Sequence, residues 1–272
     1  MSLQAAYRLV GLLQGVFGIF SVLAAARALH IFTATGENID GYLIMAAGAL
    51  LLVYGADRFA DNQKAGRPAS EAWVLLLPGL TLAPYGWWET RHTLDELAYQ
   101  MAAAALLVVL LYFLFIVKPQ QSRFKFLREL AAAIVFAWVL VAIPNRDAAD
   151  MPMLAVLFAG TCMSNLLVFS RLDYEKDSRL GMQGLLHAPW FRSDMRAMLR
   201  AAYVWILFLP LLLGIYVLAP DGLTQNGIYR MGGLYLCVVM LHWVLAEVHA
   251  SKRGAMLFRL LADAALLCWL AL

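Results

Sequence analysis

Long runs of apolar residues, separated by short polar linkers, fill almost the whole chain of 272 residues. Most runs are close to the roughly 20 residues that an α-helix needs to cross a bilayer. The pattern therefore predicts an all-α membrane protein in which residues 1–272 form a single domain, because no linker shows a change of composition. We count nine predicted transmembrane helices, at about 5–29, 41–60, 72–88, 95–117, 126–144, 152–172, 197–219, 227–249 and 255–272.

The segment at 72–88 gives the weakest signal of the nine. It is short, and it contains Pro78 and Pro84. Proline is tolerated in membrane helices where neighbouring groups satisfy the carbonyl that it leaves free. We therefore keep this segment as a helix.

Composition excludes a soluble globular protein. Hydrophobic residues make up 63% of the chain and charged residues only 14%, whereas about a quarter of the residues of soluble domains are charged. The mean hydropathy is +0.72. Cys162, Cys237 and Cys268 all lie in apolar runs without metal-ligand spacing. No basic cluster interleaved with aromatic residues indicates nucleic acid, so the expected environment is the lipid bilayer.

The basic residues are divided unequally between the two ends of the predicted helices. With nine spans, 17 of the 21 Lys and Arg residues fall on the side of the N-terminus, and only Arg27, Arg91, Arg146 and Arg230 fall on the other. Because Lys and Arg accumulate in cytoplasmic loops, this division predicts a cytoplasmic N-terminus and an external C-terminus. We expect a multi-pass protein of a bacterial-type inner or plasma membrane.

Two similar acidic motifs end the second and the sixth segments. The stretch VFSRLDYEKDSRLG contains Asp173 and Asp177, and the upstream stretch VYGADRFADNQKAG contains Asp57 and Asp61. The members of each pair are four residues apart, so both carboxylates project from one face of a helix. A single motif of this kind is most often a solvated helix end. Two of them on the cytoplasmic side, each followed by basic residues, predict a shared site.

Four carboxylates at two facing helix ends repel one another unless a cation lies between them. Mg²⁺ prefers oxygen ligands and commonly joins carboxylates to phosphate groups. Such a site suits the loss of diphosphate from an allylic carbon, because the metal and nearby cations stabilise the leaving group. The basic residues predicted to bind the diphosphate are Arg58, Lys64, Arg67, Lys118, Arg123, Lys125 and Arg179.

These motifs resemble those of the UbiA-type intramembrane prenyltransferase superfamily, and the resemblance extends over essentially the whole chain in topology. The family fold has nine helices, with aspartate motifs ending the second and the sixth. LDYEKDSRLG resembles the second family motif, which implies that Asp173 and Asp177 bind Mg²⁺ and diphosphate. GADRFAD resembles the last part of the first motif, N-D-x-x-D-x-x-x-D, and assigns the same role to Asp57 and Asp61.

Two further positions bear on the resemblance. YFLFIVK, which ends the fourth segment, is similar to a stretch in which many family members carry a Tyr and a Lys, and it implies substrate-binding roles for Tyr112 and Lys118. Where the family has Asn-Asp in the first motif, this chain has Val53 and Tyr54. The first segment lacks the common Arg-Pro entry.

Polar residues inside the segments add weaker signals. Asn165 lies about two helical turns before Asp173, so we expect it to face the predicted cavity, where it either assists catalysis or joins two helices. Arg259 and Asp263 are four residues apart, which predicts an ion pair within the last helix.

Three functions remain open from the sequence. The leading prediction is an enzyme that ionises a prenyl diphosphate and transfers the prenyl group to a lipophilic or aromatic acceptor. One alternative is a membrane terpene cyclase, in which the prenyl cation closes on itself without an acceptor. Another is a transporter of divalent cations or phosphate esters, although the second and sixth segments offer few polar residues beyond the motifs.

Overall fold

The structure is a computed structural model, and it describes residues 3–32, 39–64, 70–92, 94–112, 128–145, 147–179, 185–188, 191, 194–214, 225–248 and 255–272. Over these ranges the protein is all-helical, with nine α-helices and no strand. The helices are α1 (Leu3–Phe32), α2 (Asp40–Lys64), α3 (Ser70–Thr90), α4 (Glu96–Tyr112), α5 (Arg128–Ala137), α6 (Met151–Arg179), α8 (Met195–Leu212), α9 (Gln225–Glu247) and α10 (Ala255–Ala265). Three short helical segments accompany them, namely η3 (Trp138–Ala142), η4 (Leu185–His187) and η6 (Leu266–Ala271).

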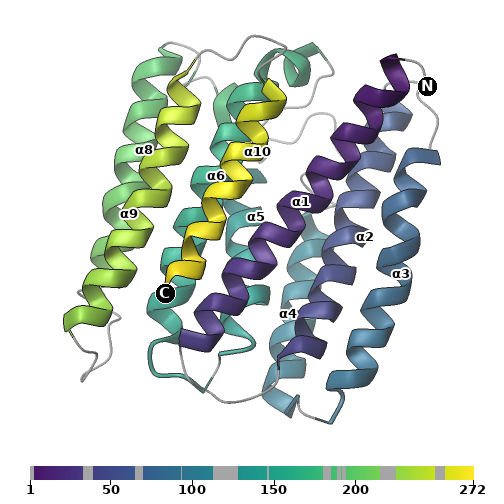
Figure 1. Cartoon of the computed structure of the whole chain (residues 1–272), viewed down its shortest axis with the longest axis vertical. Helices are drawn as coiled ribbons and strands as arrows, with labels where there is room; N and C mark the ends of the chain where they lie inside the picture. The colour runs from purple at the N-terminus through teal and green to yellow at the C-terminus, as the bar shows by residue number, and fades with distance from the viewer. Residues whose placement is uncertain are drawn as a thin grey trace.

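Within the described residues, each predicted segment is confirmed as a helix, and the order is preserved. Residues 113–117, 126–127, 215–219 and 249 of the predicted segments lie outside the described residues. The segment at 126–144 corresponds to α5 together with the π-helical turn η3, and the segment at 255–272 corresponds to α10 together with η6. Figure 1 shows the helices in one bundle, with α2 and α3 at one side, α8 and α9 at the other, and α1 and α10 between them.

The bundle has the apolar helices of a membrane protein. Among the described residues, four helices are long and apolar enough to cross a membrane, and they lie in α1, α6, α8 and α9. Further apolar helices of 10–17 residues occur at Asp40–Ala56, Glu96–Val108 and Glu129–Ala142. The prediction of an all-helical fold is therefore confirmed for the described residues, and the four long apolar helices indicate a membrane protein.

Helix α3 is continuous through both of its prolines, and it packs tightly along α2. Gly48 of α2 faces the backbone of Ala83, and Gly86 of α3 faces the backbone of Met45. A Cβ atom at either glycine would lie closer than 3.0 Å to main-chain atoms of the other helix. The close approach depends on small residues seven positions apart, which are Gly41, Gly48 and Gly55 on α2 and Ala72, Gly79 and Gly86 on α3.

Helix α6 lies at the centre of the core. It packs against α5, α8, α9 and α10, and apolar side chains such as Leu157, Phe158 and Leu167 are completely buried. Close packing of this kind is typical of protein interiors. Because α6 ends in one of the acidic motifs, its position fixes that motif against several neighbours.

Candidate functional site

The two helices that carry the acidic motifs end at the same end of the bundle. At the opposite end, Arg27 of α1 forms an ion pair with Asp40, the first residue of α2. His30 of α1 shares a hydrogen bond of 2.8 Å with Asn145, shortly before α6 begins. Since α2 and α6 both begin there, both of them run toward the end where α1 starts, as Figure 1 also shows. The predicted placement of the motifs at one end is thus consistent with the topology.

Several predicted site residues lie partly or wholly outside the described part of the structure. Asp57, Asp61 and Lys64 belong to the last turns of α2, while Asp177 and Arg179 belong to the last turn of α6. Tyr112 is the last residue of α4. The side chains of these six residues are not described, and Arg67, Lys118, Arg123 and Lys125 lie outside the described residues altogether. Their predicted roles stay predictions.

Asp173 is bound by an arginine from another helix. Arg259 of α10 donates from Nη2 to Asp173 Oδ1, and both side chains are 23% exposed. The guanidinium carbon also lies 6.0 Å from the centroid of the Phe169 ring. The close ion pair of Arg259 is therefore with Asp173 of α6, and its predicted partner on the same helix, Asp263, interacts with it only at longer range.

Asn165 and Asp263 form the next layer of this polar cluster. Asn165 Nδ2 donates to Asp263 Oδ1 at 3.2 Å, and both residues are buried. The oxygen of the same amide, Asn165 Oδ1, is buried without a hydrogen-bond partner. We call Asn165, Asp173, Arg259 and Asp263 the α6–α10 cluster. It contains two carboxylates and one guanidinium group in a largely apolar bundle.

A second polar group lies on α2. The guanidinium group of Arg58 donates to the Tyr54 hydroxyl oxygen from Nε at 3.3 Å and from Nη2 at 3.2 Å. The guanidinium carbon lies 5.6 Å from the centroid of the Tyr54 ring. Tyr54 and Arg58 are four residues apart, so the ring and the cation lie on one face of α2. We call these two residues the α2 polar group.

Helix α1 contacts both polar groups through two glycines. Gly15 lies against the ring of Tyr54, and Gly18 lies against the carboxylate of Asp263. A Cβ atom at either glycine would come closer than 3.0 Å to these side chains. The glycines are three residues apart, which is about 4.5 Å along a helix axis. The α2 polar group and the α6–α10 cluster therefore lie at a similar depth in the bundle.

The end of α6 is held by contacts with the segment that follows it and with Glu129 of α5. His187 of η4 stacks on Tyr174, with ring centroids 4.5 Å apart, and shares a hydrogen bond of 3.0 Å with Ser178. Buried Glu129 accepts hydrogen bonds from Ser170 Oγ at 2.6 Å and from the backbone N–H of Leu185 at 3.0 Å. These contacts hold the last turns of α6, and with them the second acidic motif.

His242 of α9 lies deeper and is fully buried. Its Nδ1 shares a hydrogen bond of 2.6 Å with Ser164, and its Nε2 lies 2.9 Å from the carbonyl oxygen of Ala262. With both ring nitrogens occupied, His242 joins α6, α9 and α10. In the part of the chain that the structure describes, no group of three or more His, Cys, Asp or Glu side chains is arranged to hold a metal ion.

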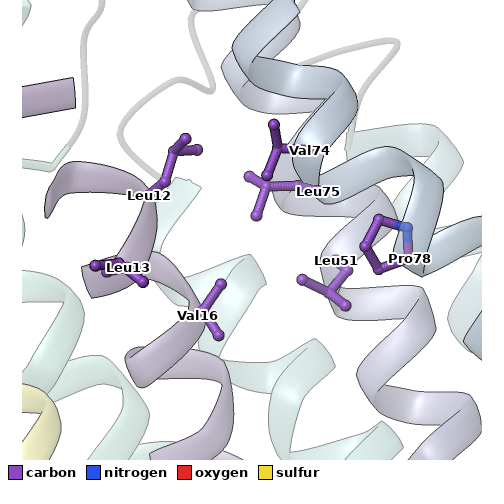
Figure 2. Close-up of a pocket in the computed structure, with 7 residues that line it drawn as sticks. All are labelled: Leu12, Leu13, Val16, Leu51, Val74, Leu75 and Pro78. Atoms are coloured by element: carbon purple, nitrogen blue, oxygen red, sulfur yellow. The ribbon is translucent and has the colours of Figure 1, made fainter. Parts of the chain in front are cut away.

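An apolar cavity of about 240 Å³ opens between α1 and the α2–α3 pair (Figure 2). On α2 it reaches Leu51, which is three residues before Tyr54, and on α1 it reaches Val16, which follows Gly15. The cavity therefore begins next to the α2 polar group. Its lining residues are Leu12, Leu13, Val16, Leu51, Val74, Leu75 and Pro78.

Comparison with known proteins gives no family for this chain, since no family model, no curated protein and no solved structure matches it. The case for a function therefore depends on the residues and contacts described above.

Three residues of the site region were not assigned to the site from the sequence. Arg259 and Asp263 were interpreted as a local pair, and Glu129 was not considered. A signal was available for all of them, because an ionisable residue within an apolar helix is costly and is usually retained for a partner or a function. The sequence did not show that the partner of Arg259 is 86 positions away.

Proposed function

We propose that this chain is a Mg²⁺-dependent membrane enzyme that ionises a prenyl diphosphate and transfers the prenyl group to a lipophilic or aromatic acceptor. The proposal includes nine membrane-spanning helices of the UbiA type, with the acidic motifs at the cytoplasmic end. One observation carries it. Gly15 and Gly18 of α1 bring the α2 polar group and the α6–α10 cluster to a similar depth, beneath the ends of both motif helices.

The donor chemistry of the site fits Mg²⁺. Asp173 offers carboxylate oxygens that are partly exposed. Hard cations such as Mg²⁺ select oxygen ligands of this kind. Asp57, Asp61, Asp173 and Asp177 would hold the metal. When bound, Mg²⁺ would supply positive charge that stabilises the diphosphate leaving group.

The basic residues of the chain bind and orient the diphosphate in this proposal. Arg58 donates to the hydroxyl oxygen of Tyr54, whose ring lies against Gly15 of α1. A guanidinium group binds phosphate oxygens through paired, charge-assisted hydrogen bonds. Lys64, Arg67, Tyr112, Lys118, Arg123, Lys125 and Arg179 are proposed to complete the binding site.

The apolar and aromatic surroundings suit the prenyl group. The ring of Tyr54 lies beside Arg58, and the ring of Phe169 lies beside Arg259. Aromatic faces stabilise a nearby cation, so they favour the allylic cation that forms when diphosphate departs. The apolar cavity next to Tyr54 offers the prenyl chain a surface without polar groups.

The proposal is tested with purified protein in lipid nanodiscs. The protein is incubated with Mg²⁺ and radiolabelled prenyl diphosphates of several lengths, with and without lipophilic acceptors, and both diphosphate release and products are measured. We expect release that depends on Mg²⁺ and stops in excess chelator. A prenylated acceptor supports transfer, whereas a cyclised product without acceptor identifies a cyclase. Transport of an unchanged substrate, with no release, overturns the proposal.

Asp173→Asn is the decisive variant, because it keeps the size of the side chain and removes the charge that binds the metal. We expect diphosphate release to fall by at least about a hundredfold, which corresponds to about 2.7 kcal/mol of transition-state stabilisation. Asp40→Asn is the matched control. Asp40 is exposed at the opposite end of the bundle and also pairs with an arginine. Equal activity in the two variants would contradict the proposal.

A further inference from the structure

The ion pair between Arg259 and Asp173 joins two helices at the level of the proposed site. Arg259 belongs to α10, and Asp173 is the first carboxylate of the acidic motif on α6. Both side chains are 23% exposed, so the pair lies at the edge of the core and not inside it. A ligand arriving from the end of the bundle where α6 finishes can therefore reach both partners.

Arg259 has bonding capacity beyond this pair. Its Nε is buried and has no hydrogen-bond acceptor. A guanidinium group carries five N–H donors in a planar fork, and the fork matches two oxygens of one phosphate group. Arg259 therefore holds one carboxylate while keeping at least one donor that a further acceptor would satisfy.

The charges of the α6–α10 cluster set up a competition. A metal ion bound to Asp173 would repel the guanidinium cation of Arg259, which holds Oδ1 of the same carboxylate. Asp263, one helical turn away from Arg259, makes its hydrogen bond with Asn165 and interacts with the arginine only at longer range, through its charge. A metal ion without an accompanying anion would therefore weaken the pairing of Arg259 with Asp173, and it would bring no new acceptor for the guanidinium group.

We propose that Arg259 changes partners during binding: it pairs with Asp173 in the empty site and passes to a diphosphate oxygen when Asp173 serves as a metal ligand. The inference rests on the proposed function and deepens it. Arg259 becomes a diphosphate-binding residue supplied by the last helix of the bundle. The exchange makes the metal and the diphosphate bind together, because the diphosphate provides the acceptor that Arg259 loses.

The test measures binding and not turnover. Mn²⁺ replaces Mg²⁺ as a probe, and its electron paramagnetic resonance signal reports the free ion. Binding of Mn²⁺ alone is compared with binding of radiolabelled inorganic pyrophosphate in the presence of Mn²⁺. In Arg259→Gln we expect Mn²⁺ alone to bind about tenfold more tightly, because the competing cation is gone, and pyrophosphate to bind at least about tenfold more weakly.

The matched control is Arg200→Gln. Arg200 of α8 forms an ion pair with Glu247 of α9 at 2.7 Å, so it also links two helices through a carboxylate, but neither residue belongs to an acidic motif. We expect both affinities to stay within about twofold of the wild type in this variant. A similar change in Arg200→Gln would show that general surface charge, and not the partner exchange, sets the affinities, and would overturn the proposal.

Asp173→Asn provides a second variant that does not depend on the folding of Arg259→Gln. It frees Arg259, so pyrophosphate without metal should bind several-fold more tightly, whereas Glu247→Gln, which removes a carboxylate elsewhere, should not show this gain. Opposite shifts of the two affinities in Arg259→Gln support the exchange. Parallel shifts or no shift, in a protein whose wild type binds both probes, overturn the exchange alone. A wild type that binds neither probe overturns the proposed function as well.

Discussion

The α2–α3 pair and the three helices α6, α9 and α10 are held together by different means. Between α2 and α3, glycines bring the two backbones into contact, as at Gly48 and Gly86. Between α6, α9 and α10, buried polar side chains form the links, as in the hydrogen bonds of His242 to Ser164 and of Asn165 to Asp263. Small residues and interhelical hydrogen bonds are the two recurrent ways of joining helices in a membrane.

The comparison distinguishes a steric requirement in one region from a requirement for hydrogen-bond partners in the other. Along α2 and α3 the requirement is steric, so any added side chain is harmful at the contact and polarity matters little. In the three-helix group the requirement is for hydrogen-bond partners, so loss of a polar atom matters more than loss of volume. The acidic motif of α6 belongs to the second group, where Asp173 pairs with Arg259 of α10. Three substitutions test this contrast, from the largest expected effect to the smallest.

Gly48→Leu should have the largest effect on stability. Its Cβ would collide with the backbone of Ala83, which cannot move unless α2 and α3 separate. We expect the free energy of unfolding to fall by at least about 3 kcal/mol, measured by denaturant titration in mixed micelles. Gly233→Ala is the control, because no atom lies within 4 Å of the added carbon. A loss no greater than that of the control would show that the close backbone contact is not what joins the pair.

His242→Leu should have an intermediate effect. It removes the hydrogen bonds to Ser164 and to the carbonyl of Ala262 while keeping an apolar side chain of similar size. We expect a loss of about 1–2 kcal/mol in the same titration, because each hydrogen bond inside a membrane protein contributes about 0.6 kcal/mol or somewhat more. Met240→Leu, at an exposed position of the same helix, should cost almost nothing. If the two variants are equally stable, the polar links do not stabilise this group.

Asp263→Asn should have the smallest effect, and we expect it to be neutral or to raise the free energy of unfolding by up to about 1 kcal/mol. The carboxylate is buried and receives one hydrogen bond, from Asn165. An amide at this position still accepts that bond, and it removes the cost of a buried charge. A loss of more than about 1 kcal/mol would contradict this prediction, because it would show that the charge of Asp263 stabilises the fold.

The helices were predictable because their signal is local. A run of apolar residues is visible within a window of about 20 positions, and the order of the predicted segments and those of their bounds that fall on described residues agree with the helices. Helix α3 was the least certain segment because of Pro78 and Pro84, yet it spans Ser70–Thr90. The pairing with α2 accounts for this, and its signal was the spacing of small residues by seven positions, which hydrophobicity alone does not detect.

The partners within the site were less predictable because they depend on packing. The spacing of Arg259 and Asp263 permits a pair on one helix, and only the position of α6 beside α10 decides that Arg259 turns to Asp173. In the same way, the burial of Asn165 against Asp263 requires the packing of two helices that are far apart in sequence. Residue types and helix ends can be read from the sequence, whereas ion pairs across the bundle cannot.

The glycine contacts between α2 and α3 also bear on how the chain enters a membrane during synthesis. By length and composition, α3 is not among the helices that qualify to cross a membrane, whereas α1, which precedes the pair, is. Its close fit to α2 offers a partner that is made immediately before it. We therefore expect the translocation machinery to receive α2 and α3 as a helical hairpin, so that a glycine substitution would already act on the ribosome-bound chain.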